Sequence, residues 1–359
     1  MPSLPSLTIE PRTSYLIGSH LMSISHDIES SNVFLIARFF IASLAVCGNA
    51  IIILTIFRSS RLCTRAYNIL IAQLAVADLI VGLGLLVRVI ATSILKLNPP
   101  ENYTELYCVS VASITVFGCQ LSQLTVLLIA IDRLTAIKWP LDYKNKDPFW
   151  YPLRRFLVCV FLSCGGLGAL YINIDIDNHI PVCTLGGKDI RGFAPYWIAF
   201  SLLLCIMIFA TYGYTLHLLH DTSEMQKKME CTREFARQKK VFLTISVVLL
   251  SYFICYVCPF VSLFFGIIFE APELILSLLV LINGVTMGVN AAVNILLYGW
   301  KYKELRVAMI DFVRGEERPR ELSYKTDGCL SIQHSRRKCT PSSERTAPPF
   351  ELAEGDVLL

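Results

Sequence analysis

Charged side chains are scarce in this sequence. Only 17% of its 359 residues are Asp, Glu, Lys or Arg, whereas 54% are hydrophobic. A soluble domain has about 25% charged residues. The charges are also segregated, so that long stretches carry almost none. This composition excludes an ordinary soluble protein, and we do not interpret the net charge of +4 as a sign of nucleic-acid binding.

Seven of the charge-poor stretches are long enough to cross a bilayer, which takes about 20 mostly apolar residues. Each must be helical, because hydrocarbon offers no hydrogen-bond partner to a backbone amide. The sequence therefore predicts an all-α membrane protein, a bundle of seven transmembrane helices. The spans are expected at roughly 33–57, 67–94, 107–131, 153–174, 194–219, 240–268 and 274–299.

Catalytic and transport constellations are also lacking. At membrane depth we find no Cys/His, Ser/His or multi-carboxylate set, and elsewhere no P-loop and no metal-ligand cluster. His217 and His220 fit a polar helix end better than a metal site. A transporter or channel remains the alternative from another class. It is disfavoured because transporters usually contain internal repeats and broken helices, whereas Pro259 is the only proline deep within a span.

Basic residues indicate how the chain is oriented. They gather in the loops after the first, third, fifth and seventh spans, whereas the alternate loops carry mainly Asp and Glu. Because short cytoplasmic loops are rich in Lys and Arg, we expect the amino terminus outside and the carboxyl terminus inside, in a multi-pass plasma-membrane protein. No cleavable signal peptide is apparent, so we expect the first span to serve as the insertion signal.

Three regions follow from this topology. Residues 1–31 form an extracellular segment too short to bind a ligand alone, so a ligand should enter the helix bundle or lie on its loops. Residues 32–313 form the membrane domain, in which 300–313 have the spacing of an amphipathic helix on the inner leaflet. Residues 314–359 should be a disordered cytoplasmic tail. Its Ser and Thr residues are either phosphosites for a receptor kinase and arrestin or generic disordered sequence.

Two features belong to the outer side. Of thirteen cysteines, the topology places only Cys108 and Cys183 there, and disulfides persist only in the oxidising compartment. We therefore expect a Cys108–Cys183 bridge, with two free thiols as the alternative. Asn102-Tyr103-Thr104 is an N-glycosylation sequon whose occupancy is open, because it lies close to the membrane.

The third span carries the most specific motif. Cys108 and Arg133 are 25 residues apart, which is about 38 Å of helix and one membrane crossing. The segment AIDRLTAIKWPLDY (130–143) resembles the Asp-Arg-Tyr motif and following loop of rhodopsin-like G-protein-coupled receptors, with Leu134 in place of Tyr. The whole resemblance extends from residue 33 to about 313.

The resemblance implies roles at the inner end of the bundle. Asp132 would restrain Arg133 at rest, and Arg133 would contact a heterotrimeric G protein once the sixth helix swings outward. Leu141 would be the apolar side chain that enters the G protein. Tyr298 would take part in the same coupling. An ordinary interfacial Asp–Arg pair is the alternative.

The resemblance also implies a polar core. The segment NAAVNILLY (290–298) is similar to the family's Asn-Pro-x-x-Tyr motif, with Ile295 replacing Pro. A carboxylate at mid-membrane is costly and indicates function, and Asp78 is such a residue. On the family's pattern an internal sodium pocket would be formed by Asn49, Asp78, Ser122, Asn290 and Asn294. A protonated Asp78 in a hydrogen-bond network without sodium is the other interpretation.

The sixth span combines matches with departures. Pro259 should kink it, because proline removes one helical hydrogen bond. Phe253 matches the family's transmission Phe, whereas Val257 replaces its usual Trp. The fifth span lacks the usual proline and the fourth the usual Trp. These departures do not affect the expected fold, but they put the family's usual toggle mechanism in doubt.

The ligand is only weakly constrained. Thr115 stands where amine receptors have Asp, and residues 274–299 contain no Lys, which excludes a retinal Schiff base. Arg38 and Arg88 lie within spans near their outer ends. They could anchor an anionic ligand or a peptide carboxylate, or they could snorkel or pair with acidic loop residues. On the family's pattern the rest of the pocket would be lined by Thr115, Cys119, Phe260, Phe264 and Gly284.

Within the family, the Asp-Arg-Leu variant and the missing Trp and prolines look similar to nematode serpentine chemoreceptors of the SX class. A small chemosensory molecule is then the expected ligand. An invertebrate peptide receptor is the alternative.

Overall fold

The computed structural model describes residues 31–97, 103–172, 193–227 and 246–315, together with residues 28, 174, 179 and 180. The described elements are α2 (Asn32–Arg58), α3 (Ser60–Cys63), α4 (Ala66–Leu97), β1 (Tyr103–Thr104), α5 (Glu105–Lys138), α6 (Pro140–Lys144), α7 (Trp150–Leu170), β2 (His179–Ile180), α8 (Phe193–Lys227), η1 (Phe253–Val257), α10 (Cys258–Ile268), α11 (Glu273–Lys301) and α12 (Lys303–Arg314).

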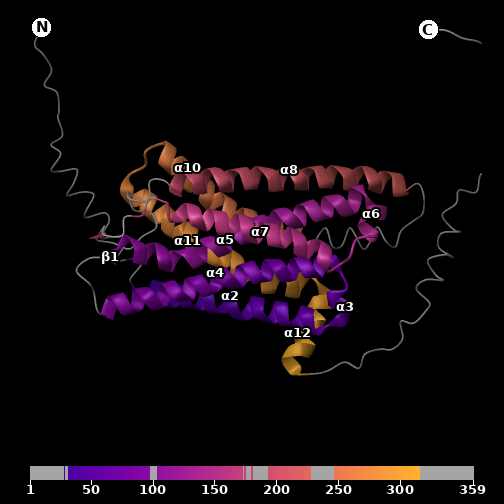
Figure 1. Ribbon diagram of the computed structural model, residues 1–359, viewed down its shortest axis with the longest axis horizontal. Helices are drawn as coiled ribbons and strands as arrows, with labels where there is room; N and C mark the ends of the chain where they lie inside the picture. The colour runs from indigo at the N-terminus through magenta and orange to yellow at the C-terminus, as the bar shows by residue number, and fades with distance from the viewer. Residues whose placement is uncertain are drawn as a thin grey trace, which may run out of the picture.

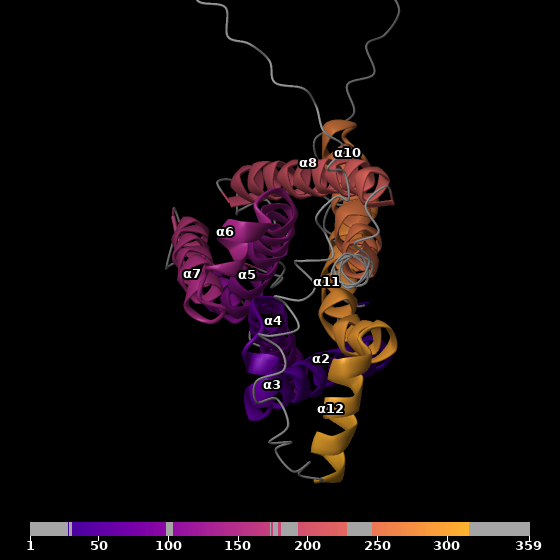
Figure 2. The same ribbon diagram turned by 90° about the vertical axis from the view of Figure 1, so that its right-hand side faces the viewer.

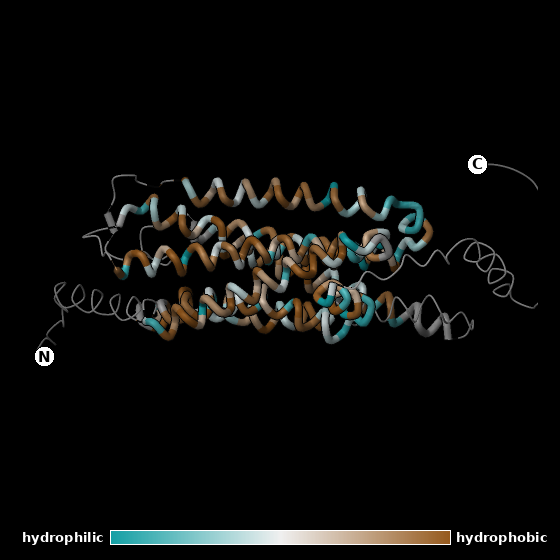
Figure 3. Tube along the Cα trace, turned by 90° about the horizontal axis from the view of Figure 1, so that it is seen from below, coloured by the Kyte–Doolittle hydropathy of each residue, from teal (hydrophilic) through white to brown (hydrophobic). Residues whose placement is uncertain are grey.

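Seven helices have the length and apolar composition needed to cross a membrane, which confirms the predicted fold class. They are Asn32–Arg58, Ala66–Leu97, Glu105–Lys138, Trp150–Leu170, Tyr196–His220, Ser246–Ile268 and Leu278–Lys301. Hydrophobic residues dominate their middle parts, and hydrophilic residues gather towards their ends (Figure 3). The chain is therefore a multi-pass membrane protein.

The long helices run side by side along one axis (Figure 1). The short strand β1 lies at one end of the bundle, and α3, α6 and α12 lie at the opposite end. Viewed along the bundle, α4 and α5 run between α2 on one side and α7 on the other (Figure 2). The spans of α4 and α5 are accordingly the most buried of the seven.

Glycines allow α4 and α5 to approach closely. A Cβ atom on Gly118 of α5 would lie 2.7 Å from the backbone nitrogen of Val81, and one on Gly84 of α4 would lie 2.5 Å from Thr115 Oγ1. Small residues at such crossings let helix backbones pack closely in membranes. This packing forms the rigid centre on which the polar residues described below are held.

The third and fourth spans differ in length from the prediction. The third continues to Lys138, seven residues beyond the expected end at 131, and therefore carries the Asp132-Arg133 pair within regular helix. The fourth ends at Leu170 rather than 174. Its start at Trp150 is set by Asp147, whose carboxylate accepts hydrogen bonds from the amides of Trp150 and Phe149, and these bonds hold the pKa of Asp147 below its usual range.

The sixth span departs from α-helical geometry where a kink was predicted. Residues Phe253–Val257 form a π-helical turn, η1, immediately before the helix that contains Pro259. The amide of Cys258 donates to the carbonyl of Phe253, five residues earlier. Because proline has no amide hydrogen, it leaves a backbone carbonyl in the preceding turn without its usual donor. A π-turn next to the proline allows such carbonyls to accept from other amides.

Helix α12 is the predicted amphipathic helix, with a corrected start. Tyr302 is non-helical and separates α11 from α12, so Trp300 belongs to α11. Its side chain is 66% exposed. Leu305 and Met309, two apolar residues of this helix, are buried against the bundle. Gly315 ends the helix in the left-handed region, at φ 70°, where glycine carries no steric penalty.

The end of the bundle that carries β1 is described in part. β1 pairs antiparallel with β2, with Tyr103 opposite Ile180 and Thr104 opposite His179. Cys108 is disulfide-bonded. Cys183, its expected partner, and Asn102 lie outside the described residues, so the pairing and the glycosylation stay predictions. Most of residues 1–31 and nearly all of 314–359 also lie outside them.

Candidate functional site

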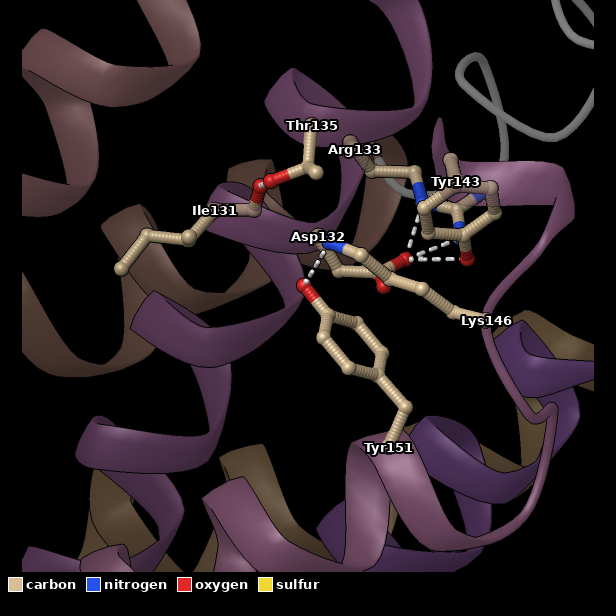
Figure 4. Close-up of polar contacts among 7 residues, drawn as sticks. All are labelled: Ile131, Asp132, Arg133, Thr135, Tyr143, Lys146 and Tyr151. Atoms are coloured by element: carbon tan, nitrogen blue, oxygen red, sulfur yellow. Dashed lines mark hydrogen bonds and ion pairs between the residues drawn. The ribbon is translucent and has the colours of Figure 1, made fainter. Parts of the chain in front are cut away.

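The carboxyl-terminal end of α5 places Asp132 and Arg133 in direct contact. Arg133 forms an ion pair with Asp132 Oδ2, and the hydroxyl of Tyr143 donates to the same oxygen at 3.0 Å. Arg133 Nη2 also donates to the Tyr143 oxygen at 3.2 Å. Figure 4 shows the three side chains converging on this carboxylate oxygen. Asp132 therefore holds Arg133 from α5, and Tyr143 holds both from α6.

Tyr143 was not found by sequence reasoning. It is the last residue of the segment that carries the family resemblance, but nothing in the spacing shows that α6 folds back onto Asp132. Burial raises the pKa of Tyr143 above its ordinary value, so the phenol stays neutral and keeps the proton that it donates to Asp132. Arg133 is thus held by one charged partner, Asp132, and one neutral partner, Tyr143.

A second group of side chains supports α6 from α7. The Tyr143 ring packs edge-on against the Tyr151 ring, with centroids 6.5 Å apart. Lys146 Nζ donates to the Tyr151 hydroxyl at 3.1 Å, and the guanidinium carbon of Arg155 lies 4.3 Å from the centre of the Tyr151 ring. Tyr143 is therefore held against α5 by contacts with α7.

Two more predicted coupling residues, Leu141 and Tyr298, differ in exposure. Leu141, on α6, is 72% exposed, which leaves its apolar side chain accessible at the end of the bundle where α6 lies. Tyr298, on α11, is 3% exposed and lies in the core. Exposure of Leu141 fits a contact with a partner protein, whereas Tyr298 would need a rearrangement of the bundle to reach one.

The predicted polar core forms around Asp78, which is 1% exposed. Ser122 Oγ donates to Asp78 Oδ1 at 2.8 Å, and the amide of Asn294 donates to Oδ2. The structure thereby joins α4, α5 and α11 through one carboxylate. Each carboxylate oxygen has a donor, as a buried carboxylate requires.

The two other predicted core residues bind elsewhere. Asn49 Nδ2 donates to the carbonyls of Ala45 and Ala291, at 2.8 and 2.9 Å, and so fastens α2 to α11. Asn290 Oδ1 accepts a hydrogen bond from Ser251 Oγ at 3.5 Å, which links α11 to the sixth span. Neither is hydrogen-bonded to Asp78 among the described contacts.

An internal sodium ion fits part of this geometry. Asp78 and Ser122 offer oxygen ligands, and Asn49 Oδ1 is a buried oxygen without a hydrogen-bond donor. Against this, Asn294 presents its amide nitrogen to Asp78, which suits a network without an ion. In the described part of the chain no group of three or more His, Cys, Asp or Glu residues could hold a metal. Both interpretations of the core stay open.

The sixth span turns a column of aromatic side chains towards the core. Tyr252, Tyr256 and Phe260 stack in a column, with centroid distances of 5.1 and 6.3 Å, and all three are buried. Phe253 is instead 41% exposed and packs edge-on against Phe209 of α8. The transmission role assigned to Phe253 stays a prediction, and the buried tyrosines are the residues that sequence reasoning missed.

Most of the predicted pocket residues are packed within the bundle. Thr115 lies against Gly84 of α4, and Cys119 Sγ lies 3.6 Å from Met287 Sδ of α11. Phe260 is 1% exposed, and Phe264 contacts Phe265 edge-on at 5.8 Å. No carboxylate is present on α5 between Glu105 and Asp132, so this helix offers an amine no counter-ion at mid-membrane depth.

The two intramembrane arginines differ in burial. Arg38 is 5% exposed, and its guanidinium carbon lies 4.6 Å from the centre of the Phe34 ring. Arg88 is partly exposed. Asp175 and Asp177, two of their alternative partners, lie outside the described residues. Whether these arginines anchor a ligand therefore stays a prediction.

Comparison with known proteins identifies the family of this chain. The chain is 25% identical over 299 residues to trace amine-associated receptor 7e of Rattus norvegicus, covering 77% of this chain and 81% of that receptor. It is 23% identical over 277 residues to the histamine H2 receptor of Homo sapiens, covering 73% and 74%. A family model described as serpentine type 7TM GPCR chemoreceptor Srsx matches residues 42–313. The chain therefore belongs to the Srsx family of serpentine chemoreceptors, which are seven-transmembrane G-protein-coupled receptors.

Proposed function

We propose that Asp132, Arg133 and Tyr143 form the switch through which this receptor activates a heterotrimeric G protein. The observation that carries the proposal is the joint hold of Asp132 and Tyr143 on Arg133 at the inner end of α5. A ligand that favours a conformation without these contacts frees the arginine for the G protein. Such a shift needs only a difference in the ligand's affinity for the two conformations.

The exposed side chain of Leu141 completes this proposed contact surface. It lies on the same short helix as Tyr143, so one movement of α6 would displace both. The G protein would thus meet a freed Arg133 and an apolar Leu141 together.

The proposed ligand is a small chemosensory molecule that enters from the outer end of the bundle. The relatives named for trace amines and histamine suggest an amine, but Thr115 and its neighbours on α5 supply no counter-ion for one. Arg38 and Arg88 favour a ligand with an acidic group. A peptide with a free carboxylate is the second candidate, supported by the same two arginines.

The proposed topology has the amino terminus outside and the carboxyl terminus in the cytoplasm, in the plasma membrane. It is supported by the basic loops at the end of the bundle that holds α3, α6 and α12. The tail at 314–359 would serve receptor kinases and arrestin, and the exposed apolar residues Ile310 and Val313 of α12 would lie on inner-leaflet lipid.

Replacement of Arg133 tests the switch. Arg133→Ala should abolish agonist-driven nucleotide exchange in a promiscuous G protein, because the proposed effector contact is lost, while surface expression persists. Surface labelling of an extracellular tag provides the control for delivery. Signalling equal to the wild type at the same surface density would refute the role of Arg133.

A further inference from the structure

A chain of hydrogen bonds joins α12 to the inner end of α4. Arg65 Nη1 donates to the Tyr67 hydroxyl at 2.8 Å, and the Tyr67 and Tyr302 hydroxyl oxygens lie 2.7 Å apart. The Tyr302 hydroxyl donates to Asn68 Oδ1 at 3.0 Å, so the Tyr67 hydroxyl must be the donor to Tyr302. We name these four residues the tyrosine chain. All of its donors point the same way, an arrangement in which hydrogen bonds reinforce one another.

The tyrosine chain is anchored at both ends. Asn68 is fully buried and donates to the carbonyl of Leu62 at 2.9 Å, which fixes it to α3. Arg65 forms an ion pair with Glu304 in the first turn of α12. Burial raises the pKa of Tyr302, so its hydroxyl remains protonated and able to donate. The start of α12 is therefore held at a defined place against α3 and α4, at the end of the bundle seen in Figure 1.

Tyr67 also touches the arginine of the switch. The guanidinium carbon of Arg133 lies 5.8 Å from the centre of the Tyr67 ring, within the range of a cation–π contact. The ring of Tyr67 packs against that of Tyr302, with centroids 5.9 Å apart. The Tyr67 side chain thus contacts Arg133 with its ring, and Tyr302, the residue before α12, with its hydroxyl and ring. Tyr143 holds Arg133 through separate contacts from α6.

We propose that Tyr67 and Tyr302 are positioning residues that couple α12 to Arg133, so that α12 docked on α4 keeps the arginine in its resting place. The inference rests on the proposed function, in which Arg133 is the contact for the G protein. A partner or lipid that draws α12 away removes the support of the Tyr67 ring. The ligand then needs a smaller difference in affinity between the two conformations to release the arginine.

Hydroxyl deletion separates the two contacts of Tyr67. Tyr67→Phe keeps the ring beside Arg133 but removes the hydroxyl that bonds Arg65 and Tyr302. Tyr302→Phe removes the hydroxyl that bonds Tyr67 and Asn68, and Tyr67→Leu removes the ring beside Arg133 as well. Each Phe variant should raise basal nucleotide exchange about threefold, and Tyr67→Leu about tenfold, as expected for the small net loss of one hydroxyl's hydrogen bonds, or of those bonds and a cation–π contact. The two Phe substitutions combined should raise exchange by less than the product of their separate effects, because both break the Tyr67–Tyr302 bond.

Two readouts distinguish coupling from a purely structural role. Full-length receptor in lipid nanodiscs is assayed for basal nucleotide exchange and for hydrogen exchange of the α12 amides, residues 303–314. Both should rise together in Tyr67→Phe and Tyr302→Phe. Glu304→Gln, at a 43% exposed side chain that can be replaced without disturbing the core, should produce the same pair of changes more weakly. Tyr214→Phe, at a 43% exposed tyrosine of α8, is the matched control and should change neither.

Faster hydrogen exchange in α12 with basal nucleotide exchange at the wild-type level would overturn the proposal, as would no change in either measurement. That result would leave the proposed function intact if Arg133→Ala still abolishes activation. If wild type and Arg133→Ala activate equally, the proposed function fails and the coupling proposal fails with it. The hydrogen-exchange data would then still report whether the tyrosine chain holds α12.

Discussion

Loss of the Tyr143 hydroxyl should make this receptor more active without a ligand. Tyr143→Phe removes the bond donated to Asp132 at 3.0 Å and the bond accepted from Arg133 at 3.2 Å, and it retains the ring that packs against Tyr151. Hydrogen bonds to charged groups contribute about 1.5–3 kcal/mol each. Because Asp132 and Arg133 still pair with each other and Tyr143 is partly exposed, we take about 1–2 kcal/mol for the net loss.

A loss of this size shifts the equilibrium between resting and active conformations by a factor of about 5–30. Basal nucleotide exchange should rise by the same factor, provided that only a small fraction of the receptors is active without a ligand. The assay compares basal and maximal nucleotide exchange in purified receptor with a promiscuous G protein. The surface densities of the variants are matched beforehand in cells. Maximal exchange should change little, because Arg133 itself is retained.

Tyr151→Phe provides the matched control. It also deletes one phenolic hydroxyl near α6, but that hydroxyl accepts from Lys146 and does not contact Asp132. We expect its basal rate to remain within about twofold of the wild type, as for a surface hydrogen bond of small net value. A basal rate for Tyr143→Phe that equals this control would refute the reasoning.

Three further predictions concern the core and the ligand. Sodium chloride should raise the thermal midpoint of the wild type above that in choline chloride of equal concentration, and Asp78→Asn should remove the difference; equal wild-type midpoints would favour the network without sodium. Gly118→Ala should destabilise the bundle by about 1–3 kcal/mol, because its Cβ would lie 2.7 Å from the backbone nitrogen of Val81, whereas Gly168→Ala meets nothing within 4 Å and should be near neutral in the same melting assay. Arg88→Ala should weaken the response to acidic agonists selectively, and equal losses for acidic and neutral compounds in a concentration-response screen would retire the anchor hypothesis.

Much of the polar core could be predicted because membrane depth fixes where residues lie along a span. Asp78 could be placed near mid-membrane because it lies in the middle of the second span, whereas Ser122 and Asn294 were placed beside it by the family resemblance. The family resemblance also predicted that these residues lie on the sides of their helices that face one another. The structure joins these three and gives Asn49 and Asn290 other partners, because those hydrogen bonds depend on how α2 and the sixth span rotate about their axes.

The contacts at the end of the bundle that holds α6 and α12 could not be predicted in the same way. Tyr143 reaches Asp132 only because α6 folds back after Pro140, and Tyr67 meets Tyr302 across 235 residues of chain. Residues so far apart contact one another through the packing of helices, which no local pattern records. The sixth span shows the same limit, because its sequence predicts a kink at Pro259 but neither the π-turn at Phe253–Val257 nor the burial of Tyr252 and Tyr256.

The sequence by itself determined that the chain crosses a membrane in seven helices and where its mid-membrane carboxylate, Asp78, lies. These conclusions need only the cost of burying polar groups in hydrocarbon and the fixed rise of a helix. Only the tertiary structure decided which side chains hold Arg133 and how α12 is attached, because those contacts depend on the angles at which helices pack and on short segments that fold between them.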